Sequence, residues 1–320
     1  MANSNFNVDI DAAAVTSQYE NEKVTPATSK KINFDIKNYL QAKLGPNETS
    51  KTMTIRLLPF SAEVKTPFKK VHMHTVKVNK GVSASGWKTF VCPITNKDDE
   101  GNPFGEKCPF CEVSQKAKKL LKEGDNTEAM AKKYSDIEYM NRPKEMWLVR
   151  CIERGHEEDG VKFWMFPVSK KGEGVYDKIN NLFTQRMKED DYNVLSLIDG
   201  KDLVVTLKKG SDGKTTVQII DKSKPSPLSE DEEQMEAWVN DNKKWQDVYT
   251  VKPYNFMEIV VNNGVPKYSK DLGGWYDSTK AENKETESEE KEDDEPKGVD
   301  YSEIVNGKSN AVYDGNRYEF

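Results

Sequence analysis

The feature that most restricts this chain is a cysteine pair spaced to hold one metal ion. Cys108 and Cys111 are separated by two residues, so a single tight turn can present both sulfurs to the same ion. Cys92 lies fifteen intervening residues upstream, and His74 lies a further seventeen intervening residues back, at the end of a predicted strand. Structural zinc takes four nitrogen or sulfur ligands in a tetrahedron. The spacing therefore predicts one structural Zn²⁺, held by His74, Cys92, Cys108 and Cys111.

Two other interpretations of the cysteines stay open. Cys-Pro-Phe-Cys followed by a helix is also typical of glutaredoxin-type sites, where the helix N-terminus lowers the thiol pKa. That motif normally follows a first βα strand near the chain start, whereas here a third cysteine and two histidines precede it. Ordinary buried thiols are the other alternative. His72 remains a rival ligand, because residues two apart on a strand point the same way. Cys151 is expected in the core, and His156 on the surface.

Composition limits the class of protein. Only 35% of the 320 residues are apolar and 32% are charged, so one packed core is not expected to reach both ends. The chain lacks an apolar run of about 18 residues and a signal-type N-terminus, which predicts a soluble, unexported protein without membrane contact. Four cysteines are too few for a disulfide scaffold in a chain of this length.

Charge is unevenly distributed along the chain. Residues 281–296 contain nine acids and two lysines, whereas residues 51–150 carry nineteen Lys and Arg against twelve Asp and Glu. A basic body with an acidic tail is common in nucleic-acid-binding proteins. A solubilising tail and scattered surface lysines explain the charge equally well.

Hydrophobic periodicity divides the middle of the chain into short elements. Alternation predicts strands, and spacing of three to four residues predicts helices. A capping box of Ser229 and Glu232 is predicted to start one more helix. The strands are expected near 52–59, 68–78, 87–91, 146–152, 161–168, 203–207 and 215–220, and the helices over 111–124, 127–140 and 175–187.

Several short motifs occur in a fixed order along this pattern. They are IRLLP at 55–59, His74, Trp87 five residues before Cys92, Cys-Pro-x-Cys at 108–111, Arg142 five residues before Trp147, and VYDKI at 175–179. In this order, over roughly residues 50–260, the chain resembles the single-stranded DNA-binding, helix-destabilising proteins of T-even-like tailed phages. The resemblance implies a mainly β (α+β) fold with an OB-fold core, an inserted zinc subdomain and peripheral helices.

The same resemblance implies how the chain is divided and what it binds. We expect a flexible N-terminal arm over 1–45, the OB-fold core over 46–276 with its zinc subdomain at about 71–115, and an acidic, largely disordered tail over 277–320. The expected function is sequence-independent binding and protection of single-stranded DNA in phage replication, recombination and repair, without catalysis. Neighbouring copies would bind side by side, in the cytoplasm of an infected bacterial host.

Binding unpaired DNA regardless of sequence needs cations along the phosphates and aromatic faces for the bases. Arg56 interrupts an apolar strand, where an unpaired charge is costly, so a phosphate role is favoured. Trp147 and Trp164 lie in strands and fit the core or the DNA surface about equally. The cationic candidates are Arg56, Lys69, Lys70, Arg142, Lys144 and Arg150, and the aromatic candidates are Tyr139, Trp147, Trp164 and Phe166.

Three features depart from the family pattern. The family's basic N-terminal motif, which docks onto a neighbouring molecule, has no clear counterpart in the first ten residues, and the hairpin at 203–220 lacks aromatic residues. The acidic run continues to Tyr318-Glu319-Phe320, an acidic-aromatic end that predicts recruitment of replication and recombination proteins. The alternatives are a zinc-ribbon accessory factor for transcription or recombination, and an enzyme, either a thiol oxidoreductase or a nuclease. A nuclease would need clustered core acids, whereas the acids here concentrate in the tail and loop tips.

Overall fold

The computed structural model describes residues 35–60, 64 and 66–282. Most of the predicted N-terminal arm (residues 1–34 of 1–45) and of the predicted acidic tail (residues 283–320 of 277–320) lies outside these ranges. The described residues from Lys37 onward belong to one compact unit.

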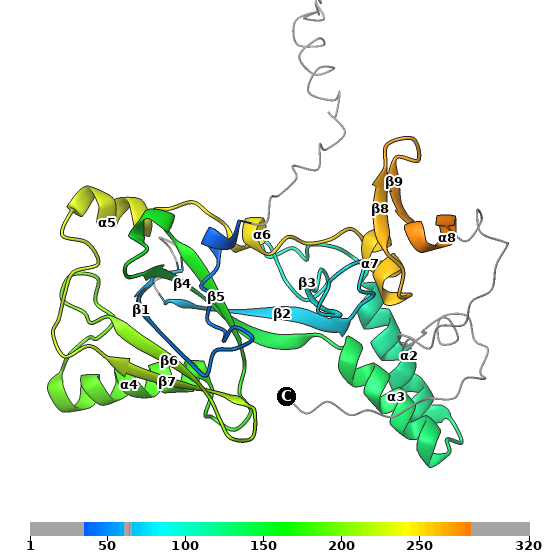
Figure 1. The fold of residues 1–320 in the computed structure, drawn as a ribbon, viewed down its shortest axis with the longest axis horizontal. Helices are drawn as coiled ribbons and strands as arrows, with labels where there is room; N and C mark the ends of the chain where they lie inside the picture. The colour runs from blue at the N-terminus through cyan, green and yellow to red at the C-terminus, as the bar shows by residue number, and fades with distance from the viewer. Residues whose placement is uncertain (1–34, 61–63, 65, 283–320) are drawn as a thin grey trace, which may run out of the picture. The chain divides into compact units, whose positions relative to one another are not determined.

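An antiparallel sheet of seven strands is the centre of this unit. The strands are β1 (Ser50–Leu58), β2 (Phe68–Lys77), β3 (Trp87–Val91), β4 (Lys144–Glu153), β5 (Lys162–Pro167), β6 (Leu203–Lys209) and β7 (Thr215–Asp221). Their order is β3-β2-β4-β1-β6-β7, with β5 on the second edge of β4 (Figure 1). β1 and β2 lie end to end along β4, because Leu58 faces Arg150 and Phe68 faces Val149. The long strand β4 therefore joins the β1–β6–β7 part of the sheet to the β2–β3 part.

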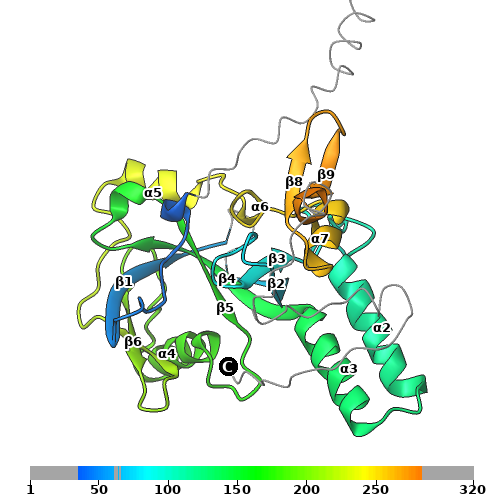
Figure 2. The ribbon, with the colours of Figure 1, turned by 45° about the vertical axis from the view of Figure 1, so that its right-hand side comes forward.

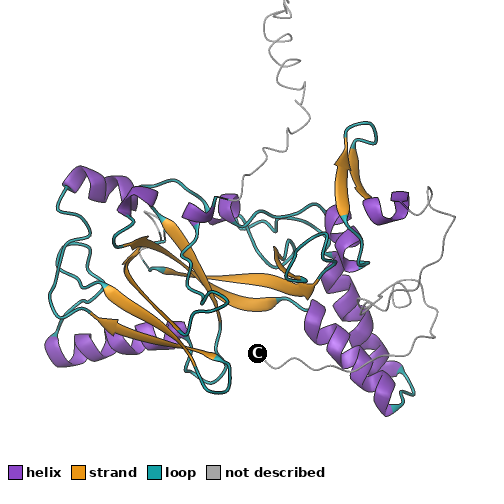
Figure 3. Ribbon diagram, viewed as in Figure 1, coloured by secondary structure: helices purple, strands orange, loops and turns teal. Residues whose placement is uncertain are grey.

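Helices and a small second sheet surround these strands (Figures 2 and 3). They are η1 (Ile36–Asn38), α2 (Pro109–Glu123), α3 (Glu128–Asn141), η2 (Glu157–Asp159), α4 (Val175–Asp190), α5 (Glu232–Val239), α6 (Trp245–Val248), α7 (Tyr254–Val261), β8 (Pro266–Ser269), β9 (Gly274–Asp277) and α8 (Ser278–Glu282). α2 and α3 pack against each other as a hairpin that leads into β4, and α4 packs against β7. No helix among the described residues is long and apolar enough to cross a membrane.

The apolar alternation in the sequence places the core as expected. Met53, Ile55 and Leu57 of β1 are buried in one cluster, which they share with Val149 of β4 and Val205 of β6. Burying each such side chain contributes about 1.5–3 kcal/mol. The predicted α+β class is confirmed: a β-rich core carries an inserted subdomain that holds the His/Cys group.

Local details differ from the sequence prediction. Helix α5 begins later than expected: Asp231 is its N-cap and accepts hydrogen bonds from the backbone N–H groups of Glu233 and Gln234, while Ser229 accepts one from Asp231. The Ser229–Glu232 capping box was therefore wrong, because Asp231 is an equally good cap closer to the helix. Helices α6 and α7 and the β8–β9 hairpin were missed, since elements of four to eight residues give little periodic signal.

Candidate metal centre and nucleic-acid interface

The four predicted ligands come together in the interior. The Nε2 atom of His74 lies 3.3 Å from Cys108 Sγ and 3.6 Å from Cys111 Sγ, and Cys92 Sγ lies 3.6 Å from Cys111 Sγ. All four ligand atoms fall within 4.8 Å of one another, and all four residues are buried. The structure thus forms one buried group that can hold a metal ion.

The spacing of these atoms fits zinc. Zinc–sulfur bonds of about 2.3 Å and zinc–nitrogen bonds of about 2.0–2.1 Å imply tetrahedral edges of about 3.8 Å between sulfurs and about 3.6 Å between sulfur and nitrogen. The observed separations are close to those edges. They are much longer than the ~2.05 Å of a disulfide, and all the cysteines are free.

Three local structures supply the ligands. His74 is on β2, Cys92 directly follows β3, and Cys108 is the N-cap of α2 with Pro109 in the first turn. Cys111 lies one turn into the same helix. A proline suits the first helical position, and the positive end of the helix dipole favours thiolates beside it. The Cys-Pro-Phe-Cys sequence therefore both starts the helix and aims two sulfurs at the site.

Two buried asparagines hold the ligands in place. The Asn141 backbone carbonyl accepts a hydrogen bond from His74 Nδ1 at 2.7 Å, which leaves Nε2 to face the sulfurs. The Asn96 amide donates to the carbonyls of His72 and Cys92, and its oxygen accepts the His72 N–H. Asn96 thus ties the Cys92 turn to β2. Sequence reasoning missed both residues, since nothing in the ligand spacing points to them.

The charge balance of the thiols also favours a cation. Hydrogen bonds from Cys108 and Cys111 lower the pKa of Cys92, whereas contacts with Cys108 and Cys92, followed by burial, raise the pKa of Cys111. One thiolate is stabilised at the expense of the next, because like charges at this distance repel. A divalent cation would remove that conflict. The burial also limits thiol exchange, which needs an accessible sulfur.

Apolar side chains enclose the group. The ring of Phe110 lies 5.2 Å from that of His74 and 5.3 Å from that of Phe90. Ile137 of α3 and Met257 of α7 belong to the same buried cluster. The packed subdomain therefore uses residues well beyond the expected 71–115.

The first group of predicted DNA-binding residues lies where α3 meets β4. The Arg142 guanidinium is 4.7 Å and the Lys144 ammonium 4.8 Å from the centre of the Tyr139 ring. Tyr139 is 46% exposed, so much of its ring remains accessible. Burial, and then the neighbouring Arg142, lower the pKa of Lys144. An exposed aromatic ring beside two cations suits a base next to a phosphate.

A second group continues along β2 and β4. Lys70 faces Trp147 across the strand pair, with its ammonium 5.2 Å from the indole centre. Trp147 stacks on Tyr176 of α4 at 4.3 Å with an interplanar angle of 13°, and Phe68 meets Tyr176 edge-on at 4.9 Å. Sequence reasoning missed Phe68 and Tyr176. The only signal for Tyr176 was its place in the VYDKI motif.

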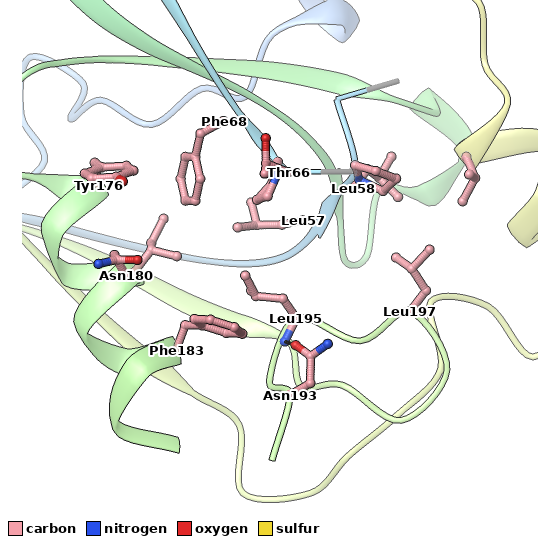
Figure 4. A pocket seen from close by; sticks show the side chains of 14 residues that line it. Leu57, Leu58, Thr66, Phe68, Tyr176, Asn180, Phe183, Asn193, Leu195 and Leu197 are labelled. Atoms are coloured by element: carbon pink, nitrogen blue, oxygen red, sulfur yellow. Dashed lines mark hydrogen bonds between the residues drawn. The ribbon is translucent and has the colours of Figure 1, made fainter. Parts of the chain in front are cut away.

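An apolar hollow of about 610 Å³ opens beside this group (Figure 4). Tyr176, Asn180 and Phe183 follow one another along α4 at one side of the hollow, with Phe68 beside Tyr176 (Figure 4). Asn180 and Asn193 add amide groups to the lining. The remaining lining is aliphatic, from Leu57, Leu58, Leu195 and Leu197 among others. None of the described residues that line the hollow is charged, so this lining suits an uncharged apolar group and not a phosphate.

Arg56 and Arg150 are interior residues, 1% and 2% exposed. Arg56 pairs with Asp202 and donates to the carbonyls of Ser196, Gly200 and Ser226. Arg150 donates to four backbone carbonyls. In this conformation neither guanidinium is available to a phosphate. Asp202, which is 146 residues away in the sequence, supplies the opposite charge that Arg56 needs within its apolar strand.

The other candidates are also divided by burial. Trp164 and Phe166 are 4% and 3% exposed and pack in the sheet core, so their rings are not accessible platforms. The Lys69 ammonium lies 5.3 Å from the Phe60 ring and 5.9 Å from that of Trp245, away from the Lys70 side of the strand. The structure thus gathers Lys70 and Trp147 in one group, and Tyr139, Arg142 and Lys144 in another.

Comparison with known proteins agrees with this picture. No curated protein matches the chain. The family model described as gp32 DNA binding protein like matches residues 49–250, which is more than half of the chain. The match spans β1 to α6 and includes the four buried ligands and both aromatic–cationic groups. The chain therefore belongs to the gp32 DNA-binding-protein-like family, a family of non-catalytic single-stranded DNA-binding proteins.

Proposed function

We propose that this protein coats and protects single-stranded DNA without regard to sequence, during phage DNA replication, recombination and repair. The observation that carries the proposal is the pairing of cations with half-buried or exposed aromatic rings at the start of β4: Arg142 and Lys144 beside Tyr139, and Lys70 beside Trp147. We call these five residues the β4 strip. Cations contact phosphates of any sequence, and every base offers a face for stacking.

The length of the strip supports this function. The five residue-to-residue steps of extended chain from Arg142 to Trp147 span about 16 Å, several times the ~3.4 Å rise per nucleotide of a duplex strand. Lys144 and Trp147 are three residues apart on β4 and point to opposite sides of the strand, so the two groups of the strip would contact different nucleotides. The described residues that line the hollow beside Tyr176 offer an unstacked base an apolar, uncharged surface.

We propose that the ion at His74, Cys92, Cys108 and Cys111 is a single structural Zn²⁺. Three thiolates, one imidazole and a closed, buried site are typical of structural zinc, and zinc would stabilise the fold of the subdomain. Proposed partners are further copies bound along the same strand, and replication and recombination proteins recruited by the acidic tail. We place the protein in the cytoplasm of the infected bacterial host.

Titration of fluorescent oligonucleotides tests the proposal. Anisotropy should show tighter binding to single-stranded than to duplex DNA of the same sequence, with little dependence on base composition. The logarithm of the binding constant should fall linearly with log salt, with a slope of about −0.7 per phosphate contacted. Preference for the duplex would overturn the proposal and favour an accessory factor of transcription or recombination.

A further inference from the structure

One hydrogen bond joins a metal ligand directly to the segment that carries part of the β4 strip. His74 Nδ1 lies 2.7 Å from the backbone oxygen of Asn141, the last residue of α3. Tyr139 and Arg142 flank Asn141 in the chain. The ligand that would bind the ion through Nε2 thus also binds, through its other nitrogen, the segment that presents the first group of the strip.

This hydrogen bond supplies a donor to a backbone carbonyl at the C-terminal end of α3. The last four carbonyls of an α-helix have no partner within the helix. Glu138 O is satisfied by Arg142 N–H and Ser114 Oγ, and Ile137 O accepts from the Asn141 amide. Asn141 is 1% exposed, so its own carbonyl has little access to water. His74 supplies the donor that this carbonyl would otherwise lack.

The bond also selects the tautomer of the ring. An Nδ1–H that donates to Asn141 leaves the Nε2 lone pair for the ion, and an ion at Nε2 keeps the proton on Nδ1. Metal binding and anchoring of the α3 end therefore favour each other. Without the ion the proton can move to Nε2, and Nδ1 then has no hydrogen to donate.

We infer that His74 and Asn141 form a tether through which the metal centre positions Tyr139 and Arg142 for DNA, so that Asn141 is a positioning residue. This inference rests on the proposed function, because it concerns the same DNA-binding strip. The tether uses the main-chain oxygen of Asn141, so it depends on the imidazole and on the local backbone but not on the asparagine side chain.

The test replaces the tether while keeping the ion. His74→Cys converts the site to four cysteines, and Cys111→His to two cysteines and two histidines, both of which are ligand sets that structural zinc accepts. Cys111 is the natural control position, since it is 6% exposed and the others are at most 1%. Only His74→Cys removes the donor to Asn141. Zinc content, hydrogen exchange and the salt dependence of single-stranded DNA binding are measured on the full chain.

With one zinc bound, the His74→Cys protein should exchange the amide hydrogens of residues 139–142 at least ten times faster than the wild type does. Its log–log salt slope should be smaller by about 0.7, the loss of one phosphate contact. Arg142→Gln added to His74→Cys should change the salt slope no further, whereas Arg142→Gln in the wild type should reduce that slope by about 0.7. Cys111→His should resemble the wild type in both measurements. A zinc-loaded His74→Cys protein with unchanged exchange and slope would overturn the tether.

A second pair of variants keeps all four metal ligands. It tests the tether even if His74→Cys or Cys111→His fails to bind zinc. Asn141→Gly and Asn141→Ala both remove the side-chain bond to Ile137, but only glycine frees the backbone that carries the carbonyl. Asn141→Gly should speed amide hydrogen exchange at residues 139–142 and lower the salt slope, and Asn141→Ala should do neither. Equal behaviour of the two would argue against the tether.

The two hypotheses fail separately. If Arg142→Gln alone leaves the slope unchanged, the assignment of Arg142 to the DNA strip is wrong. The exchange measurement, made without DNA, still tests the tether.

Discussion

The Nε atom of Arg56 lies 3.0 Å from Oδ1 of Asp202, with both side chains removed from solvent. The same guanidinium binds three backbone carbonyls from the segments 196–200 and 226, so it ties two loops to β1. Burial lowers the pKa of Arg56, and the contact with Asp202 opposes that shift. We assign Arg56 to the architecture of the core.

Arg56→Met should therefore destabilise the fold with little direct effect on DNA contacts. Removing one partner of a buried pair costs about 3–5 kcal/mol, and here three carbonyls would also lose their donor. Urea unfolding should show the loss, while the folded variant keeps the wild-type salt slope for DNA. Lys118→Gln, on the exposed face of α2, should change stability by less than about 0.5 kcal/mol. A smaller slope with unchanged stability would restore Arg56 as a phosphate ligand.

Lys70 should behave in the opposite way. Its ammonium is exposed beside Trp147 and 3.6 Å from Glu145. Lys70→Gln should reduce the log–log salt slope by about 0.7 and leave the unfolding midpoint nearly unchanged. Glu145→Gln removes a competing carboxylate and should strengthen binding at low salt. Oligonucleotide titrations at several salt concentrations measure both effects. Weaker binding by the Glu145 variant would contradict this arrangement of charges.

Trp147 should report DNA binding through its fluorescence, because its half-buried ring lies beside Lys70 in the strip. Single-stranded DNA should quench the emission of the wild-type protein, and Trp147→Phe should lose much of that quenching. Trp164→Phe is the matched control, since Trp164 is 4% exposed on the neighbouring strand. If the Trp164 variant lost the signal and the Trp147 variant kept it, the assignment of Trp147 to the DNA surface would be wrong. Trp147→Ala, which removes the stacking ring, should weaken DNA binding by about 1–3 kcal/mol.

The four thiols should react in two classes. Metal binding protects Cys92, Cys108 and Cys111, so the zinc-loaded protein should react slowly with a thiol reagent, and chelation should release three faster thiols. Cys151 should stay slow throughout, because burial raises its pKa to about 12. At pH 8 its thiolate fraction is then about 10⁻⁴, and its reaction should speed up about tenfold per pH unit. Four equally fast thiols after chelation of folded protein would contradict this prediction.

Burial decided which of the proposed DNA-binding residues stay in the proposal. Alternation along β4 assigns Trp147 and Val149 to one face and Leu148 and Arg150 to the other, but both faces are partly covered. Sequence patterns do not show which part of either face of β4 the packed helices and loops leave exposed. Tyr176 of α4 stacks on Trp147 from nearly thirty residues away, and that contact exists only after the helix packs on the sheet.

The sequence by itself determined the ligand set and most of the elements. Two cysteines separated by two residues, with a third cysteine and a histidine upstream, restrict the chemistry of the site to a few choices. Short-range periodicity places strands and helices before any packing is known. The tertiary structure decided what each polar residue does. Arg56 lies beside Asp202, and His74 beside Asn141, because β1, β2, α3 and the loops fold together over separations of 67 to 146 residues. No local pattern encodes contacts of that kind.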